Sequence, residues 1–355
     1  MGQMKRVWLI GPFVAVASLA LTAGVVEVVL TLVDYPKDQW SPWVQADHTG
    51  HAYAPNLSQR WTTSEFDITW KTNNLGLRDD EVGPKDGLRV LVVGDSFTAG
   101  YGVERRELFT SVLEDRLGVD VVNAGTGGWE LDHHYHFFRS QGRDLKPDVV
   151  LYAMYLGNDI INNGLRRQDD KGIAPNPKYP KLRERDYKLR LVWRQAVHAW
   201  EHRHVSNRRE WSPSRAYLEM SRPRLSERAR ADYTSSSYYL QQLRDEVSDA
   251  GGTLVVAMFS YRTLVEKRAR EDFLAAHPYL DLKRPENEIQ MALEELGIDH
   301  LNLNPILMES SAASEEPLYY VIDGHWTPRG HAVVGEALVD WLGRENALVS
   351  RQSVR

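Results

Sequence analysis

The sequence predicts an α/β protein, a three-layer α/β/α sandwich with a central parallel sheet, preceded by an N-terminal transmembrane helix and interrupted by a helical insertion. Two observations predict the sheet. Short apolar runs recur along the chain from about residue 88, and amphipathic helical stretches separate them. Because strands of a parallel sheet are covered by helices on both faces, this alternation is typical of the architecture. An uncharged run near the N-terminus predicts the membrane helix.

The predicted transmembrane anchor covers residues 7–33. The sequence carries no charge from Val7 to Val26, and an apolar run continues after Glu27, so the segment is long enough to cross a bilayer. Lysine and arginine directly precede it. The positive-inside rule therefore places residues 1–6 in the cytoplasm and the main domain on the extracytoplasmic side, periplasmic or extracellular. Two alternatives stay open: a cleaved secretory signal, which would also export the domain, and a buried core helix, which would need the polar face that this segment lacks.

Composition and charge exclude several kinds of protein. The chain has 355 residues, of which 42% are hydrophobic and 26% charged, as in ordinary globular proteins and unlike disordered ones. A formal net charge of -6, without a stretch dense in lysine and arginine, argues against nucleic acid as a partner. Without cysteine the chain has no disulfide, thiolate nucleophile or cysteine-ligated metal, and nothing in the sequence calls for a cofactor.

Residues 34–87 are predicted to be a juxtamembrane extension that packs on the main domain. Their aromatic side chains would be costly to leave in water, and the weak alternation of FDITWKTN indicates a short strand pair. The main domain covers residues 88–345, with the helical insertion at about 160–234, and a C-terminal tail covers residues 346–355. The insertion is charged and contains tryptophan, which suits a lid, packing or contact with sugar rings.

Apolar periodicity places the strands and helices of the main domain. The predicted strands are LRVLVVGD (88–95), VDVVNAG (119–125), PDVVLYAMYLGND (147–159) and TLVVAMFS (253–260). The predicted helices are ELFTSVLEDRLG (107–118), YYLQQLRDEVSDAGG (238–252) and GHAVVGEALVDWLG (330–343). We expect Gly118 to end the first of these helices.

Polar residues follow the ends of these strands. Ser96, the stretch 123–128 and Asn158 each come directly after an apolar run, and ligands of open parallel sheets bind beyond the carboxyl ends of the strands. Asp323 and His325, in VIDGHWTPRGH, would reach the same edge if they follow a short final strand. A serine, a histidine, a carboxylate and polar donors are the groups that acyl transfer needs.

These motifs resemble the SGNH (GDSL) hydrolase superfamily over about residues 88–343. The resemblance rests on GDSF, NAGTGG, LGND and DGHWTPRGH, which occur in the order of the family. The preceding TNNLGLRDDE is similar to bacterial members that carry an N-terminal membrane segment before the catalytic domain. The resemblance implies the SGNH-hydrolase form of the sandwich, which is flavodoxin-like.

The resemblance also implies a role for each matching residue. Ser96 would be the nucleophile, His325 its base and Asp323 the group that orients the base. The oxyanion hole would consist of the backbone N–H groups of Ser96 and Gly128 and the side-chain amide of Asn158. Each role fits the residue, because a serine hydroxyl needs a base held in the right tautomer, glycine lets the backbone approach a substrate, and asparagine donates without charge.

The spacing of the aspartate and the histidine departs from the usual pattern. Many members of the family have Asp-x-x-His, whereas only Gly324 separates Asp323 from His325. The Asp-x-His-Trp form is similar to alginate acetyltransferase-like SGNH domains, although there the pair precedes the serine and here it follows. The spacing leaves open how Asp323 reaches the histidine.

Other polar residues near these motifs have structural interpretations. We expect Asp95 to hydrogen-bond the backbone around the serine turn, and His331 to pack or to cap the last helix. His133, His134 and His136 contain no i, i+4 pair and no thiolate accompanies them, so we expect no metal site.

The sequence therefore predicts an exported, membrane-anchored serine esterase that cleaves a short-chain ester through an acyl-enzyme. Its partners would be the membrane and an ester substrate such as a glycan that carries O-acetyl groups. Two alternatives stay open: an O-acetyltransferase that acts on an envelope polysaccharide, and a carbohydrate-binding module that has kept the scaffold without turnover. The complete catalytic set argues against the second alternative.

Overall fold

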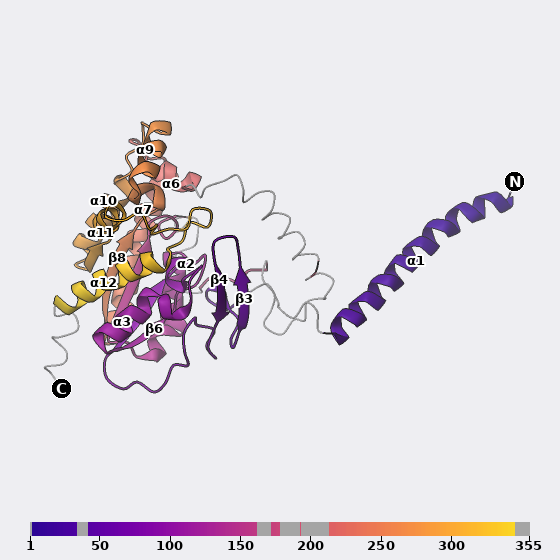
Figure 1. The fold of residues 1–355 in the computed structure, drawn as a ribbon, viewed down its shortest axis with the longest axis horizontal. Coiled ribbons are helices and arrows are strands. Elements are labelled where there is room, and N and C mark those ends of the chain that lie inside the picture. The colour runs from indigo at the N-terminus through magenta and orange to yellow at the C-terminus, as the bar shows by residue number, and fades with distance from the viewer. Residues whose placement is uncertain (1, 34–41, 162–171, 178–191, 193–212, 345–355) are drawn as a thin grey trace.

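A five-stranded parallel sheet forms the centre of the main domain in the computed structural model, which describes residues 2–33, 42–161, 172–177, 192 and 213–344 (Figure 1). The strands are β5 (Arg89–Gly94), β6 (Asp120–Asn123), β7 (Val149–Tyr155), β8 (Thr253–Phe259) and β9 (Asp299–Asn302). They lie in the order β6-β5-β7-β8-β9, and all neighbours are parallel. The predicted α/β fold with a central parallel sheet is confirmed.

Apolar side chains on both faces explain why the central strands form where they do. Every residue of β5 and β7 is buried, and so is every residue of β8 after the first. Each of the four predicted strand segments contains one of the strands β5 to β8. The sequence did not predict β9, because its four residues, DHLN, form no apolar run at the edge of the sheet.

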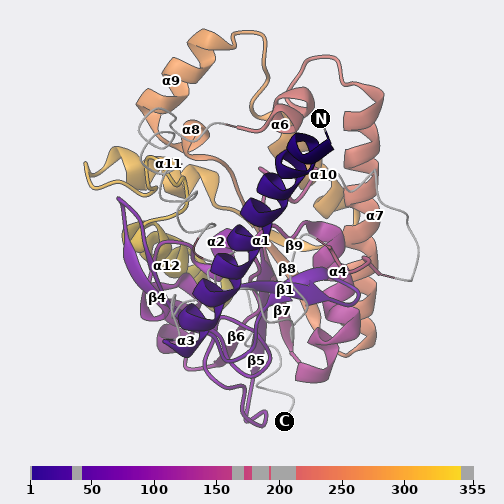
Figure 2. The same cartoon turned by 90° about the vertical axis from the view of Figure 1, so that its right-hand side faces the viewer.

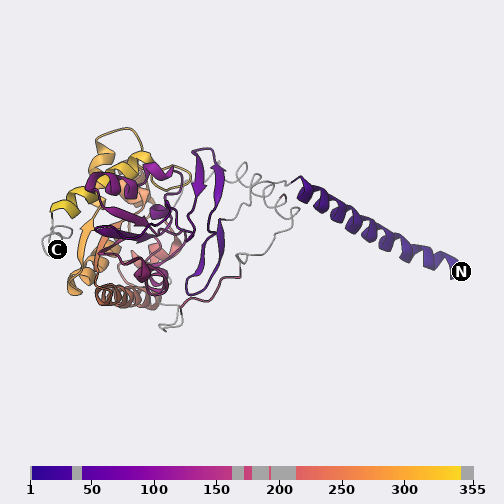
Figure 3. The ribbon, with the colours of Figure 1, turned by 90° about the horizontal axis from the view of Figure 1, so that it is seen from below.

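Helices cover both faces of the sheet (Figure 2 and Figure 3). The longer helices of the main domain are α3 (Phe109–Leu117), α4 (Leu131–Ser140), α7 (Glu227–Asp249), α10 (Arg284–Glu295) and α12 (Pro328–Arg344). α3 packs with α12 on one face, whereas α7 packs with α4 and α10 on the other. The remaining helical segments are α2 (Ser96–Ala99), α6 (Arg215–Met220), α8 (Arg262–Val265), α9 (Lys267–Ala276), α11 (Asn304–Ala312) and the 3-10 turns Arg105–Glu107 and Gly142–Leu145. Gly118, with φ 63°, ends α3 as expected.

The strand order creates a topological switch point beside β5. The chain passes from β5 to β6 on one side and then crosses to β7 on the other side. Connections therefore diverge at the carboxyl ends of β5 and β7, which is where open parallel sheets bind their ligands. Ser96 directly follows the end of β5, and Asn158 lies just beyond the end of β7.

The extension forms two antiparallel hairpins that belong to the body of the main domain. The paired strands are β1 (Trp43–Ala46) with β2 (Gly50–Tyr53), and β3 (Ser58–Thr62) with β4 (Asp67–Lys71). Buried Tyr53, Phe66 and Trp70 of the hairpins pack in one cluster with Ala99 and Tyr101, which follow Ser96 in the chain. The aromatic residues of the extension therefore pack against the segment that follows Ser96, as their cost in water led us to expect.

The N-terminal helix α1 spans Gly2–Leu32. Its part from Val14 to Leu32 has a mean hydropathy of 2.1 and is long and apolar enough to cross a membrane, and none of it is buried inside the structure. Among the described residues it is the one helix of this kind. A membrane anchor and a signal sequence share these properties, so both readings of the N-terminus remain compatible with the helix.

The loop that carries Asp323 and His325 differs from the expectation. The two residues do not follow a short final strand; they lie between α11 and α12, where an isolated antiparallel bridge joins Tyr319 to Trp326. The motif reaches the carboxyl edge through this bridged loop. The sequence of this loop shows no alternation of apolar and polar residues, because a single bridge does not require a strand pattern.

Part of the predicted insertion lies outside the described residues. Its tryptophans, Trp193, Trp200 and Trp211, are among the residues outside, as is the predicted C-terminal tail. At its far end, α7 runs continuously through the boundary expected at about residue 234. Ile173, within the insertion, donates its backbone N–H to the carbonyl of His48 at 2.7 Å, which ties this segment to the first hairpin.

Candidate active site

The turn after β5 presents Ser96 at the carboxyl edge of the sheet. Ser96 is the first residue of α2 and is partly exposed, whereas its neighbours Asp95 and Phe97 are buried. Asp95 caps this short helix as expected, because its Oδ1 accepts a hydrogen bond from the Phe97 N–H at 2.9 Å. A Cβ on Gly94 would stand 2.8 Å from the carbonyl oxygen of Ala153, so glycine is needed for the tight exit from β5.

Ser96, His325 and Asp323 form a continuous chain of hydrogen bonds. Ser96 Oγ lies 2.7 Å from His325 Nε2, and His325 Nδ1 lies 2.5 Å from Asp323 Oδ1. Because a carboxylate only accepts, Nδ1 carries the hydrogen and Nε2 accepts from the serine hydroxyl. The side chains of His325 and Asp323 are 17% and 23% exposed, which leaves the chain of bonds accessible from solvent. The structure thus brings together the three residues that the sequence assigned to catalysis.

The surroundings of His325 favour its protonated form. Burial alone would lower the pKa of His325, but the charge and hydrogen bond of Asp323, together with the charge of Asp95, raise it above its ordinary value. A base with a raised pKa holds a transferred proton more firmly. The imidazole is therefore suited to take the proton of the Ser96 hydroxyl.

Gly324 explains how an Asp-x-His pair can make this contact. Its φ of 86° lies in the left-handed region that favours glycine. Two backbone hydrogen bonds close the bend: the Gly324 N–H donates to the Tyr320 carbonyl at 3.1 Å, and the Tyr320 N–H donates to the His325 carbonyl at 2.8 Å. The bend replaces the extra residue of the Asp-x-x-His spacing.

Two aromatic rings pack against the imidazole of His325. The ring centroids of Phe97 and Tyr101 lie 4.7 Å and 5.0 Å from that of His325. Both aromatic side chains are buried and come from the segment that begins at Ser96. The segment that begins at Ser96 therefore helps to hold the His325 imidazole in its rotamer.

Asn158 is linked to the serine turn through Asp95. Its Nδ2 donates to Asp95 Oδ2 at 3.0 Å, while the other carboxylate oxygen of Asp95 holds the Phe97 N–H. Burial raises the pKa of Asp95 to about 6, against the lowering effects of the Phe97 N–H, His325 and Asn158. Within the described residues, the second hydrogen of Asn158 Nδ2 has no protein acceptor, and the side chain is partly exposed.

Gly128 lies in a loop that packs closely on α2. The Thr126 N–H donates to the Gly94 carbonyl at 2.9 Å, and a Cβ on Gly125 would stand 2.3 Å from the Ala99 backbone nitrogen. Gly128 is exposed, with φ 75°, and in the described part of the chain neither its N–H nor that of Ser96 has an acceptor. Two unpaired backbone donors and the Asn158 amide are thus available in the loops that follow β5, β6 and β7.

Arg78 supports the turn after α2 and was not singled out from the sequence. Its buried guanidinium donates to the carbonyl of Ala99 at 2.5 Å and also to those of Gly100 and Val103, and it lies 4.1 Å from the centroid of Trp70. Burial lowers the pKa of Arg78 to about 10. An arginine in TNNLGLRDDE looks like a surface charge in sequence, and only the fold reveals the carbonyls that it contacts.

His331 is not a second base. The side chain is fully buried, and burial lowers its pKa to about 3, so it is neutral. The backbone N–H of Phe109, the first residue of α3, donates to His331 Nδ1 at 3.3 Å. This agrees with the packing role expected for it, although the helix that it helps to cap is α3 and not its own helix.

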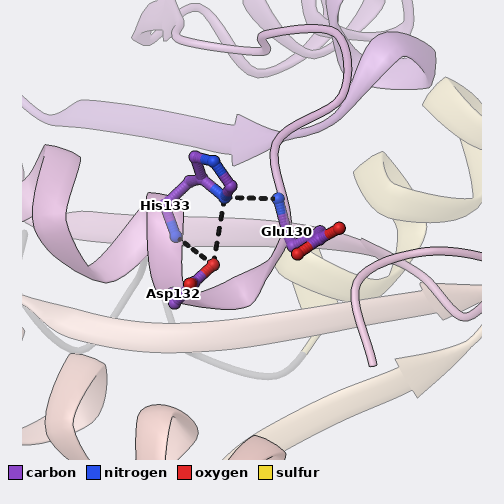
Figure 4. Close-up of side chains that lie close together, drawn as sticks. All are labelled: Glu130, Asp132 and His133. Atoms are coloured by element: carbon purple, nitrogen blue, oxygen red, sulfur yellow. Dashed lines mark hydrogen bonds and ion pairs between the residues drawn. The ribbon is translucent and has the colours of Figure 1, made fainter. Parts of the chain in front are cut away.

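Glu130, Asp132 and His133 gather at the start of α4 in an arrangement that could hold a cation (Figure 4). His133 Nδ1 accepts from the Glu130 N–H at 3.1 Å, and the Asp132 side chain accepts from the His133 N–H at 2.9 Å. A metal on His133 Nδ1 would have to displace the Glu130 N–H. The two hydrogen bonds close the first turn of α4, where acidic side chains also face the positive end of the helix dipole, so the cluster fits a helix cap.

The family model described as SGNH hydrolase-like domain, acetyltransferase AlgX matches residues 219–353, which include Asp323 and His325. The resemblance to the SGNH superfamily is confirmed. Several solved SGNH structures are similar in fold. A putative lipolytic protein of the G-D-S-L family from Desulfitobacterium hafniense is 13% identical, over 72% of this chain and 99% of that one, with a TM-score of 0.41.

Two further solved structures are esterases. The acetyl xylan esterase AlAXEase is 13% identical over 72% of this chain and 100% of its own, with a TM-score of 0.42. A catalytic mutant of an acetylxylan esterase from Geobacillus stearothermophilus is 16% identical over 74% of this chain and 98% of its own, with a TM-score of 0.39. Similarity at this level carries no information about substrate. No curated protein matches the chain.

Proposed function

We propose that the protein is a serine esterase that removes a short acyl group from an ester through an acyl-enzyme on Ser96. One observation carries the proposal: Ser96 Oγ lies 2.7 Å from His325 Nε2, and the other ring nitrogen of His325 lies 2.5 Å from Asp323 Oδ1. A serine hydroxyl alone is a weak nucleophile, and this arrangement supplies both the base and the carboxylate that orients the base.

The reaction has two halves. Ser96 Oγ attacks the carbonyl carbon of the ester while His325 Nε2 takes the hydroxyl proton, and Asp323 stabilises the imidazolium. The bond between the carbonyl carbon and the alcohol oxygen then breaks, and His325 returns the proton to the leaving alcohol. Water next attacks the acyl-serine with His325 as base, which releases the carboxylic acid and restores the Ser96 hydroxyl.

Three donors would stabilise the negative oxygen of each tetrahedral intermediate. They are the backbone N–H groups of Ser96 and Gly128 and the second hydrogen of Asn158 Nδ2. This assignment is supported by the absence of a protein acceptor for any of the three donor hydrogens in the described part of the chain. One such donor typically contributes about 2.7–4 kcal/mol to transition-state stabilisation.

We further propose that the acyl group is acetyl, carried on a glycan on the extracytoplasmic side of the membrane. The matched family model is described as an acetyltransferase, which supports a small acyl group. An anchored domain outside the cytoplasm would meet envelope polymers first, and α1 is compatible with such an anchor. The charged insertion offers few apolar runs with which to line a pocket for a long acyl chain.

A chain-length series tests the esterase proposal. Purified protein should hydrolyse p-nitrophenyl acetate several-fold faster than the octanoate, and Ser96→Ala should lower kcat by at least about 10⁴-fold, because the acyl-enzyme cannot form. A Ser96→Ala variant as active as the native chain would contradict the mechanism. A preference for octanoate would contradict the acetyl assignment. If the native chain and Ser96→Ala both bind glycan and neither hydrolyses the ester, the protein is a binding module instead.

Acetyl transfer to a sugar is the second candidate. The acetyltransferase description of the matched model favours it, because the match includes the Asp-Gly-His-Trp stretch of the site. In chemical terms a sugar hydroxyl would replace water in the second half of the reaction, with the same base. Adding an oligosaccharide acceptor to the acetate assay separates the two: an acetylated sugar identifies the transferase, and acetate alone identifies the esterase.

A further inference from the structure

His51, in hairpin strand β2, contacts the loop that carries Gly128. Its Nε2 lies 3.0 Å from the carbonyl oxygen of Gly127. Because a carbonyl oxygen only accepts, Nε2 carries the hydrogen and donates. In return, Trp129 Nε1 donates to the His51 carbonyl at 3.0 Å, so the strand and the loop are joined on both sides of Gly128.

The carbonyl of Gly127 and the N–H of Gly128 belong to the same peptide unit. In a trans peptide these two groups point in opposite directions. A hydrogen bond that fixes the carbonyl therefore also fixes the direction of the N–H. Two consecutive glycines allow such a peptide to turn over at little steric cost, and Gly128 has a positive φ of 75°.

We propose that His51 is a positioning residue that orients the 127–128 peptide, so that the Gly128 N–H faces the carbonyl oxygen of an ester bound at Ser96. The proposal rests on the proposed function and adds the residue that sets one of its donors. His51 is 6% exposed, so water has little access to take over its hydrogen bond. Tyr53 lies two residues after His51 in β2. Its hydroxyl accepts a hydrogen bond from the Gly127 N–H at 2.7 Å and so holds the preceding peptide unit, 126–127.

Substitutions at His51 and Tyr53 separate the two peptides. His51→Phe keeps an aromatic ring and removes the donor, so kcat for p-nitrophenyl acetate should fall about 10- to 100-fold with little change in KM, because the lost interaction acts in the transition state. His51→Gln, whose amide also donates, should recover most of the loss. Tyr53→Phe is the matched control and should reduce kcat less, since it frees the 126–127 peptide instead.

A crystal structure of His51→Phe gives a readout that does not depend on activity. We expect the 127–128 peptide to be turned over or present in two orientations, compared with one in the native chain. Native orientation together with native kcat would overturn the proposal, as would a change in KM alone. If His51→Phe does not fold, His51→Asn, whose amide is too short to reach the carbonyl, takes its place. If the native protein is active and the His51 variants have the same kcat and peptide orientation, only this inference is refuted. If the native protein is inactive, the proposed function is refuted.

A different observation carries a second inference. The loop between α11 and α12, residues 313–327, carries Asp323 and His325 and is called the triad loop. Glu65, in the turn between β3 and β4, accepts three successive backbone N–H groups of this loop, from Val321 at 2.8 Å, Ile322 at 3.0 Å and Asp323 at 2.7 Å. We infer that Glu65 is a positioning residue for the Asp323 carboxylate. Three bonds to one carboxylate fix the backbone from which the Asp323 side chain reaches His325.

The pH dependence of kcat/KM tests the role of Glu65. The charges that face His325 are those of Asp323 and Asp95, and Asp323 raises the pKa of His325. A loosened Asp323 should let this pKa fall toward its ordinary value. Since the base acts unprotonated, the acid limb of the profile should move to lower pH in Glu65→Ala, while the plateau falls about 10-fold or more. The acid limb and plateau of Glu65→Gln should lie between those of Glu65→Ala and those of the native chain.

Glu81→Gln is the matched control for Glu65. Glu81 also belongs to the extension and also accepts a backbone N–H, from Asn74 at 3.0 Å, but among the described residues no hydrogen bond joins it to the triad loop. Its substitution should leave the profile unchanged. The inference would be overturned if the pH profile of kcat/KM for Glu65→Ala kept the acid limb and plateau of the native chain. It would also be overturned if Glu81→Gln changed the profile as much as Glu65→Ala does.

Discussion

At the scale of single residues, Gly324 accounts for the departure of this chain from the Asp-x-x-His pattern. A left-handed bend at φ 86° brings Asp323 Oδ1 to 2.5 Å from His325 Nδ1, although only one residue separates them. Any side chain at residue 324 would strain this conformation. The carboxylate therefore lies within hydrogen-bond distance of the histidine despite the shorter spacing, and its proposed contribution to catalysis can be tested.

Asp323→Asn should lower kcat/KM about 10²- to 10⁴-fold at neutral pH, less than Ser96→Ala, because the amide favours the wrong tautomer of His325 while the nucleophile and donors remain. Asp323 raises the pKa of His325, so the substitution lowers it. The acid limb of kcat/KM should then move to lower pH, since the base stays unprotonated further into acid. A pH-rate profile checks both effects. An acid limb displaced to higher pH would contradict the assignment of His325 as the base.

At the scale of elements, the two hairpins that precede β5 support the loops of the candidate active site. Arg78 donates to three carbonyls of the turn after α2, and the buried aromatic residues of β2 and β4 pack against Tyr101. Tyr101 in turn lies against the ring of His325. The extension therefore contributes to the stability of the turn that follows Ser96 and also covers this turn.

Arg78→Leu should lower the free energy of unfolding by about 3 kcal/mol or more, because three buried carbonyls lose a charged donor. Arg78→Lys, which keeps the charge but has a different geometry, should lose less. Urea denaturation of the purified protein measures the difference. Arg106→Leu serves as the control, because it removes an exposed charge from the 3-10 turn that follows the same loop. Equal stabilities of Arg78→Leu and the native chain would contradict the role given to this residue.

The sequence predicted the elements and site residues that carry local signals. Four strands have apolar runs, and Ser96, Asn158 and the Asp323–His325 pair belong to short motifs. β9 was missed because DHLN has no such run. His51, Glu65 and Arg78 were missed for another reason: their partners are backbone groups 21 to 258 residues away in the chain. A hydrogen bond to backbone imposes no pattern on the sequence of its partner, so only the fold can reveal it.

At the scale of the whole molecule, an apolar helix and an α/β domain are joined in one chain. The segment Val14–Leu32 has the length and hydropathy of a membrane span. Basic residues precede it and no cationic excess follows, which favours an extracytoplasmic domain. Such a location would restrict the protein to ligands or substrates at the surface of the membrane or in the envelope.

Reporter fusions after residue 38 test this topology. Alkaline phosphatase, which needs an oxidising compartment, should be active there, and a fluorescent protein that folds only in the cytoplasm should be dark. The opposite pattern would reverse the orientation. Mass spectrometry of the mature N-terminus is the accompanying measurement, because a chain that begins near residue 24 would identify a cleaved signal instead of an anchor.

Detection of an acyl-enzyme on Ser96 tests the proposed mechanism directly. Native protein mixed with p-nitrophenyl acetate and quenched in acid within the first turnover should carry one acetyl group, and peptide mapping by mass spectrometry should place it on Ser96. Asp323→Asn, in which deacylation should also be slow, offers a variant that accumulates the intermediate. An acetyl group on Ser96 that disappears with further incubation is the predicted result. Turnover of the ester without any acetyl on Ser96, or with the acetyl on another residue, would contradict the account.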